Sequence, residues 1–194
     1  MAEAIEPPER PEPESGSGES EARRVSDSSS LLVRWMSIID ANSGGFIHGG
    51  TVMRLVDEAA GLAAIKHSGR RVVTAGVDRM TFNTPVFVGE LLRCTASVNA
   101  VWRTSMEVGV RVEAENPFTG ETRHTSTAYL TMVALDEGVP VPAPHLIAES
   151  DDEKRRRHTE EGPVECFGYF ACHSFNPLLF CFWTHSLCLT SSVP

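Results

Sequence analysis

The chain has 194 residues with 41% hydrophobic and 22% charged residues and a formal net charge of -9, which is enough for one core of ordinary size. Eight acidic but only three basic residues lie in residues 1–28, so the remainder is mildly acidic and gives no sign of a nucleic-acid-binding surface. No apolar run reaches the length of a membrane span, and the N-terminus resembles neither a secretory signal nor a mitochondrial transit peptide. We therefore expect a cytoplasmic protein.

Residues 1–30 are rich in Glu, Pro, Ser and Gly and contain few side chains that could be buried. We expect this segment to be a disordered tail. A folded domain is predicted over residues 31–147, beginning with an extended segment from Leu31 to Ile39. The glycine-rich stretch Asp40–Gly45 then predicts a loop.

A helix is predicted from about His48 to Lys66, with Gly49 and Gly50 at its start. Its apolar residues leave only a narrow polar stripe, so we expect the rest of the fold to enclose most of it. The stripe has the i, i+3, i+4, i+7 spacing of one helix face and comprises Arg54, Asp57, Glu58 and Gly61. His67–Gly69 is a reasonable stop signal.

Four segments rich in alternating apolar residues follow, and each predicts a strand. They cover residues 72–82, 90–101, 106–114 and 123–135. Short turns between them predict an antiparallel meander. Together with the single helix, this pattern predicts an α+β fold in which a curved antiparallel sheet wraps around one long helix.

The C-terminal region changes character twice. Residues 148–163 form a charged segment that could hold a short exposed helix, and the cations of Lys154–Arg157 are interpreted as one solvated face of it. Residues 164–194 contain four of the five cysteines among many aromatic residues, without a C-x-x-C pair. This spacing disfavours a zinc site, and we expect no metal. We interpret residues 164–194 as a tail outside the fold.

The helix start and the carboxylate on the stripe together suggest hydrolysis at a carbonyl. Free N–H groups at a helix start stabilise developing negative charge, and a carboxylate in apolar surroundings can act as base or nucleophile. Gly50 and Asp57 are seven positions apart, or about 10 Å along the helix axis. One carbon cannot lie about 3 Å from both groups, so catalysis should require Asp57 of one subunit and the helix start of another.

The segments Phe46–Gly50 (Phe-Ile-His-Gly-Gly) and Leu55–Gly61 (Leu-Val-Asp-Glu-Ala-Ala-Gly) resemble those of the hotdog-fold acyl-CoA thioesterases, most closely the cytosolic acyl-CoA hydrolase group. The strand segments Val73–Asp78, Thr104–Val108 and Ala128–Leu130 are similar to those of the same family. The resemblance covers roughly residues 31–153. It implies a hotdog fold that hydrolyses fatty acyl-CoA to fatty acid and coenzyme A, as part of fatty acid metabolism, without a cofactor. It also implies homodimers, often assembled as trimers of dimers.

Carried over by position, Asp57 matches the catalytic carboxylate of this family. The segment His48–Gly50 matches the helix start that polarises the thioester carbonyl. Arg103, Thr104 and Ser105 resemble the segment that lines the coenzyme A slot, and Arg79 is a further candidate for its phosphates.

Alternatives follow from the same residues. Many family members have an asparagine two residues before the histidine, where this chain has Phe46, so a non-catalytic or half-competent subunit that binds acyl-CoA or a paralogous partner is the second hypothesis. A hotdog hydratase is a third, although its usual His-acid motifs are missing. Asp57 and Glu58 could also be a solvated helix face, with Glu58 paired to Arg54, and His48 could have only a packing or hydrogen-bonding role.

Overall fold

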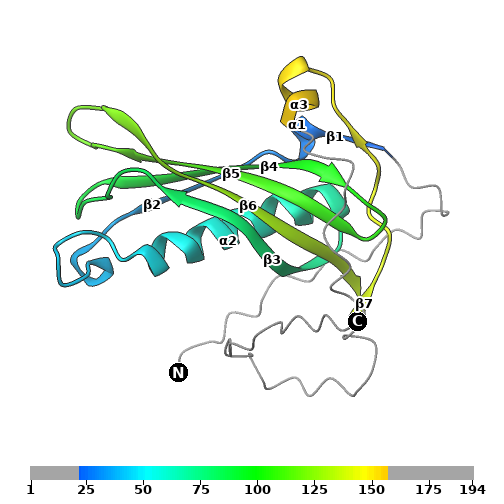
Figure 1. Ribbon diagram of the computed structural model, residues 1–194, viewed down its shortest axis with the longest axis horizontal. Helices are drawn as coiled ribbons and strands as arrows, with labels where there is room; N and C mark the ends of the chain where they lie inside the picture. Colours follow the sequence, from blue (N-terminus) through cyan, green and yellow to red (C-terminus); the bar gives the residue numbers. More distant parts are fainter. Residues whose placement is uncertain (1–21, 157–194) are drawn as a thin grey trace, which may run out of the picture. The chain divides into compact units, whose positions relative to one another are not determined.

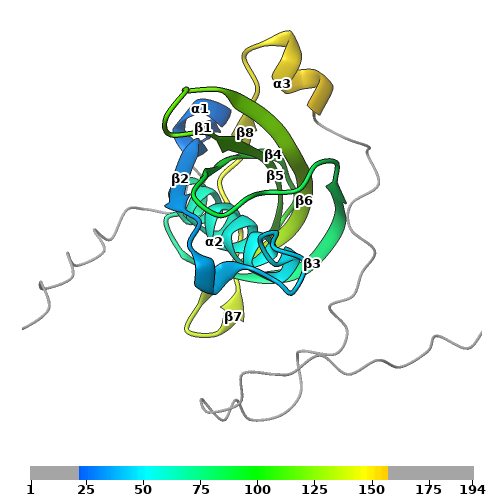
Figure 2. The ribbon, with the colours of Figure 1, turned by 90° about the vertical axis from the view of Figure 1, so that its left-hand side faces the viewer.

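The computed structural model describes residues 22–156, which form a curled antiparallel sheet around the long helix α2 (Gly49–Ser68) (Figure 1). The strand order is β2-β4-β5-β6-β3, with β7 also pairing with β6. Seen from the end of the helix, the sheet curves around it on one side (Figure 2). This arrangement confirms the predicted hotdog fold. The strands are β2 (Ser30–Trp35), β3 (Arg71–Phe82), β4 (Leu91–Val101), β5 (Ser105–Glu115), β6 (Thr122–Asp136) and β7 (Val139–Pro140).

The predicted meander is wrong for one strand. β4, β5 and β6 follow one another as expected, but β3 pairs with β6 at the far edge of the sheet, and β4 pairs with β2 instead. The connection from β3 to β4 is too long for a tight hairpin and its backbone is bonded elsewhere. The N–H of Ile47 donates to the carbonyl of Val86, and Phe46 forms a β-bridge with Phe87. The connection therefore packs beside the start of α2 and carries the chain from β3, at one edge of the sheet, to β4, next to β2.

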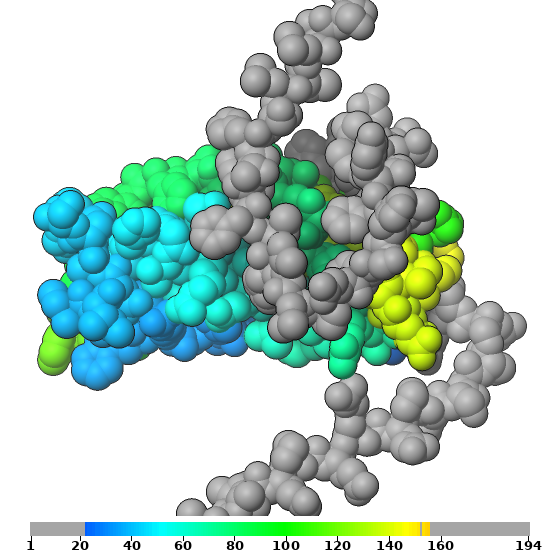
Figure 3. All heavy atoms as spheres, turned by 90° about the horizontal axis from the view of Figure 1, so that it is seen from below, coloured from blue at the N-terminus to red at the C-terminus, as the bar shows by residue number. Residues whose placement is uncertain are grey.

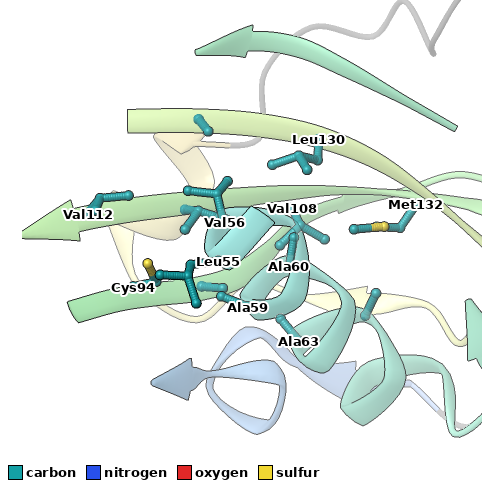
Figure 4. Packing of buried hydrophobic residues seen from close by; sticks show 14 of the residues in the cluster. Leu55, Val56, Ala59, Ala60, Ala63, Cys94, Val108, Val112, Leu130 and Met132 are labelled. Atoms are coloured by element: carbon teal, nitrogen blue, oxygen red, sulfur yellow. The ribbon is translucent and has the colours of Figure 1, made fainter. Parts of the chain in front are cut away.

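One face of α2 builds the core. Its buried residues are small or branched apolar ones, and they pack against inward-facing residues of β4, β5 and β6 (Figure 4). Alanine at four of these positions lets the helix lie close to the sheet. The packed residues include Leu55, Val56, Ala59, Ala60 and Ala63 of α2 with Cys94, Val108, Val112, Leu130 and Met132 of the strands.

The expectation that α2 is enclosed on nearly all sides is wrong for the single chain. Met53, Leu62 and Ile65 are 45%, 44% and 46% exposed, because the sheet covers only one side of the helix and, among residues 22–156, no second layer lies on the other. The first half of α2, in cyan, reaches the surface beside the blue part of the chain that precedes it (Figure 3). This exposed apolar side of α2 is available for a contact with another chain.

The ordered fold begins before the expected boundary at Leu31. β1 (Arg23–Arg24) pairs in parallel with β8 (Leu146–Ile147), and α1 (Val25–Ser28) follows with Val25 buried. The segment between β2 and the loop forms a short 3-10 helix, η1 (Ile38–Asp40), rather than continuing the strand.

The predicted charged segment contains the short helix α3 (Asp151–Arg156). The predicted N-terminal disorder of residues 1–21 and the interpretation of residues 164–194 as a tail lie outside the described residues. Among residues 22–156, no helix is both long and apolar enough to span a membrane.

Candidate active site

The start of α2 is capped by His48. Its Nδ1 accepts a hydrogen bond from the N–H of Gly50 at 3.0 Å, and its carbonyl accepts from Thr51 at 2.9 Å. The N–H of Gly50 is therefore already used within the chain. The N–H of Gly49 has no acceptor among residues 22–156 and is the donor left free at the helix start. This geometry supports the hydrogen-bonding role considered for His48.

The position of His48 depends on Asp40, a buried residue that the sequence did not single out. The carbonyl of Asp40 accepts from the N–H of His48 at 2.8 Å, and its carboxylate accepts from the N–H and hydroxyl of Ser37 and from Arg34. The hydrogen bond from the Ser37 backbone, together with the Ser37 hydroxyl and Arg34, holds the pKa of Asp40 below its usual value despite burial. In the sequence, this role of Asp40 could have been recognised from the Ser-x-x-Asp spacing of Ser37 and Asp40, which is typical of a capping box.

Asn42 lies in the loop that leads to the helix start. Its side-chain oxygen accepts from the backbone N–H groups of Gly44 (2.8 Å) and Phe46 (3.3 Å), and its backbone N–H donates to the carbonyl of Phe46. These bonds fix the side chain, and within residues 22–156 no acceptor lies against its amide NH2 group. The ring of Phe46 packs edge-on against Phe87, with ring centroids 5.6 Å apart.

Asp57 projects from the exposed side of α2 and meets the sheet through Thr74. The hydroxyl of Thr74 donates to Oδ1 of Asp57 at 2.5 Å. This bond fixes one carboxylate oxygen and leaves the other for a reactant. Asp57 and Thr74 line a groove of about 430 Å³, the aspartate groove, that also follows Gly61, Leu62 and Ile65.

A second cavity, the mouth cavity, lies at the start of α2. It has a volume of about 180 Å³ and includes Gly49, Val52, Phe82 and Ser126 in its lining. Gly49 and Asp57 therefore belong to two different depressions of the same chain, as expected from their separation along the helix.

The other predicted residues are spread over the fold. Arg103 and Thr104 form the turn between β4 and β5, and Ser105, which begins β5, pairs with Val133 near the C-terminal end of α2. A helix of 20 residues is about 30 Å long, so one chain does not bring this turn to Gly49. Arg79 lies exposed on β3, opposite Tyr129.

Glu58 pairs with Arg54 at 3.9 Å on the exposed side of α2. This contact confirms the solvated-face interpretation for Glu58, the residue that directly follows Asp57.

A model of the thioesterase superfamily matches residues 44–120. Protein VdlD of Helicobacter pylori is 37% identical over 133 residues, which cover 68% of this chain and 76% of that protein. The chain belongs to the thioesterase superfamily. The cytosolic acyl coenzyme A thioester hydrolase of Rattus norvegicus is 35% identical over 145 residues, and these span 38% of that longer protein.

Solved structures of acyl-CoA thioesterases are similar to this chain in fold and sequence. A hexameric acyl-CoA thioesterase without ligand has 40% identity and a TM-score of 0.68 over 71% of this chain and 88% of its own. An acyl-CoA hydrolase from Staphylococcus aureus, solved with butyryl coenzyme A and coenzyme A, has 34% identity and a TM-score of 0.66 over 71% of this chain and 85% of its own.

The Staphylococcus aureus hydrolase was also solved as three alanine variants, of an asparagine, of an aspartate 15 residues later and of a threonine 17 residues after that. Asn42, Asp57 and Thr74 are the same residue types at the same separations. By this spacing the substituted asparagine of that hydrolase corresponds to Asn42 in the loop. Phe46, where the family resemblance leads us to expect an asparagine, does not have this separation from Asp57.

Proposed function

We propose that this chain hydrolyses acyl-CoA thioesters to the free acid and coenzyme A, at sites that two copies of the chain build together. The observation that carries the proposal is the set of Asn42, Asp57 and Thr74, with a free helix-start N–H at Gly49. Relatives named as acyl-CoA hydrolases support the same chemistry.

The chemistry follows from charge development on the thioester oxygen. The N–H of Gly49 donates to that oxygen, and one well-placed donor of this kind contributes about 3–4 kcal/mol. The amide of Asn42 is a second donor near the helix start. Asp57, oriented by Thr74, either removes a proton from the attacking water or attacks directly. The C–S bond then breaks, and the thiolate of coenzyme A takes up a proton. If Asp57 attacks directly, the resulting anhydride between the acyl group and Asp57 is hydrolysed by water, which releases the free acid and restores the carboxylate. Water is the only co-reactant, so no cofactor is needed.

A two-fold axis beside Met53 satisfies the geometry. Met53 lies midway between Gly49 and Asp57, so two antiparallel α2 helices crossing there place each Asp57 opposite the partner's Gly49. The same rotation lays the loop of the partner's Asn42 over Gly61 and the aspartate groove. The exposed apolar side of α2 is what such a contact would cover.

We assign the homodimer as the catalytic unit and a trimer of dimers as its further assembly, in line with relatives described as hexameric. In this antiparallel arrangement the C-terminal end of one α2 lies on the same side of the axis as the start of the other, about 16 Å farther along the helix direction. Arg103, Thr104 and Ser105 of one copy would then contact the coenzyme A bound at the other's helix start, with Arg79 as a further phosphate contact. We infer a cytoplasmic location, as for the cytosolic relatives.

The alternative of a non-catalytic subunit rested on Phe46 in place of asparagine. Because Asn42 has the same separation from Asp57 as the two residues substituted in the Staphylococcus aureus hydrolase, this alternative is not favoured.

Substitution of Asp57 by Asn tests the function directly. We expect purified wild-type protein to release coenzyme A from acyl-CoA, and Asp57→Asn to lower kcat by about 10²- to 10⁴-fold, the usual contribution of a general base. Release of thiol measures the rate. Glu58→Gln, on the same helix face but paired with Arg54, is the matched control and should retain activity. Wild-type activity in Asp57→Asn would refute the mechanism.

A further inference from the structure

The mouth cavity lies directly beside the proposed donor of the active site. Gly49 and Val52 form its helix side, and Phe82 stands opposite, with its ring 3.8 Å from where a Cβ of Gly49 would lie. A thioester oxygen bound to the N–H of Gly49 would therefore place its carbonyl carbon at the rim of this cavity.

Small residues on facing elements create the space. On β6 the inward-facing side chains Ala128, Leu130 and Met132 pack under α2. Ser126, two residues before Ala128, faces the same way because side chains alternate along a strand, and it is only 1% exposed. On the helix side the lining residues are Gly49, which has no side chain, and Val52.

The far wall of the cavity is firmly held. The N–H groups of Asn83 and Thr84 donate to the carbonyl of Thr125 at 2.8 and 3.4 Å. Arg123 donates to the carbonyl of Pro85 at 2.9 Å and forms a two-pronged ion pair with the carboxylate of Glu90. These contacts fasten the β3–β4 connection to β6 and hold this wall of the cavity in place.

Resting on the proposed function, we propose that the mouth cavity holds the acyl chain and selects short and medium-chain acyl-CoA. Its volume of about 180 Å³ equals about six groups of 30 Å³ each, the share of one water in the liquid and close to the size of one methylene. Ile47, Val52, Phe82 and Val86 give it mostly apolar walls, which suit an alkyl chain. The sulfur and the coenzyme A arm then leave on the opposite side.

Chains longer than about six carbons would fill this cavity and extend outward past Phe82. This side chain is 54% exposed and forms the open side of the cavity. Phe82 and Ser126 are therefore the residues that determine chain-length specificity.

The test compares Ser126→Val, which puts methyl groups into the cavity, with Thr127→Val, the next residue on the opposite face of β6. Affinities for ethyl-, hexyl- and dodecyl-CoA thioethers are measured by calorimetry, and kcat/KM is measured for the matching acyl-CoA esters. Ser126→Val should weaken hexyl-CoA binding and hexanoyl-CoA turnover about tenfold or more, the usual effect of a methyl group on a fitted pocket. The ethyl and acetyl values should change less than about threefold, and Thr127→Val should behave as wild type.

Phe82→Ala is the second variant, and it should improve the dodecyl-to-hexyl ratio by opening the cavity. Unchanged chain-length profiles in both Ser126→Val and Phe82→Ala would overturn the assignment. The binding arm separates this failure from failure of the proposed function. A wild-type protein that hydrolyses no acyl-CoA, yet binds hexyl-CoA in a manner that depends on Ser126, would refute the thioesterase proposal and support the cavity.

Discussion

Thr74 determines how the carboxylate of Asp57 is presented. A hydrogen bond to a charged group contributes about 1.5–3 kcal/mol, and each 1.4 kcal/mol is about tenfold in rate. If the bond orients the reactive carboxylate, Thr74→Val should lower kcat about 10- to 100-fold with little change in KM. Steady-state kinetics with a hexanoyl-CoA substrate measures both constants.

The control for this prediction is Thr74→Ser, which keeps the hydroxyl. It should retain most of the activity, whereas equal losses in the serine and valine variants would show that side-chain packing, not the hydrogen bond at 2.5 Å, is responsible.

Single residues were predictable where their role depends on local spacing. Gly49 and Asp57 are visible in the sequence because helical periodicity places them. Thr74 could not be recognised as a site residue, since its contact with Asp57 joins a strand to a helix 17 positions away and depends on how the two pack. Asp40 and Asn42 act through hydrogen bonds to backbone N–H groups, which no apolar pattern reports.

The C-terminal end of α2 is anchored by a buried histidine. His67 is fully buried, and its Nε2 lies 2.9 Å from the carbonyl of Pro144 while no partner faces its Nδ1 among residues 22–156. Burial lowers the pKa of His67, although the Pro144 carbonyl opposes this, and Arg23 and Asp27 are the charged groups that affect it. The folded state therefore keeps His67 neutral.

This predicts a loss of stability in mild acid. Below about pH 6.5 the unfolded chain binds a proton at His67 that the folded chain does not. The free energy of unfolding should therefore fall by up to about 1.4 kcal/mol per pH unit as the pH drops from 6.5 toward the lowered folded-state pKa. Urea unfolding at fixed protein concentration between pH 5 and 8 measures the slope.

His67→Gln keeps an N–H donor for Pro144 but cannot titrate, so its slope in this range should be flatter than that of the wild type. The exposed neighbour His145→Gln is the control and should keep the wild-type slope. Asp40 and Glu90, whose pKa values are also lowered, lose their contribution only at more acidic pH and do not interfere. Identical slopes in wild type and His67→Gln would contradict the prediction.

Element boundaries were predictable because apolar alternation ends where strands end: the predicted 106–114 and 123–135 segments correspond to β5 and β6 within a residue or two. The order of the strands in the sheet could not be predicted in this way. The position of β3 depends on hydrogen bonds that hold the β3–β4 connection at the helix start, at Val86 and Phe87, and these partners are distant in sequence.

At the scale of the molecule, the apolar residues on both sides of α2 are consistent with the proposed dimer. The sequence predicted an enclosed helix, and the single chain covers only one side of it. The same Met53, Leu62 and Ile65 that are exposed here would be covered in the proposed dimer. The apolar residues that led to the prediction of an enclosed helix are thus of two kinds. Some pack in the core of the single chain, and the others would pack against a second chain.

A mixed dimer tests whether each site really draws on two chains. Asp57→Asn and Asn42→Ala should each be nearly inactive as homodimers. A purified heterodimer of the two variants would hold one site with both substitutions and one with neither, so it should regain about half of the wild-type activity per dimer. Differently tagged chains allow its isolation, and thiol release measures its rate. If both residues served one site within a single chain, every site of the heterodimer would carry a substitution and no activity would return.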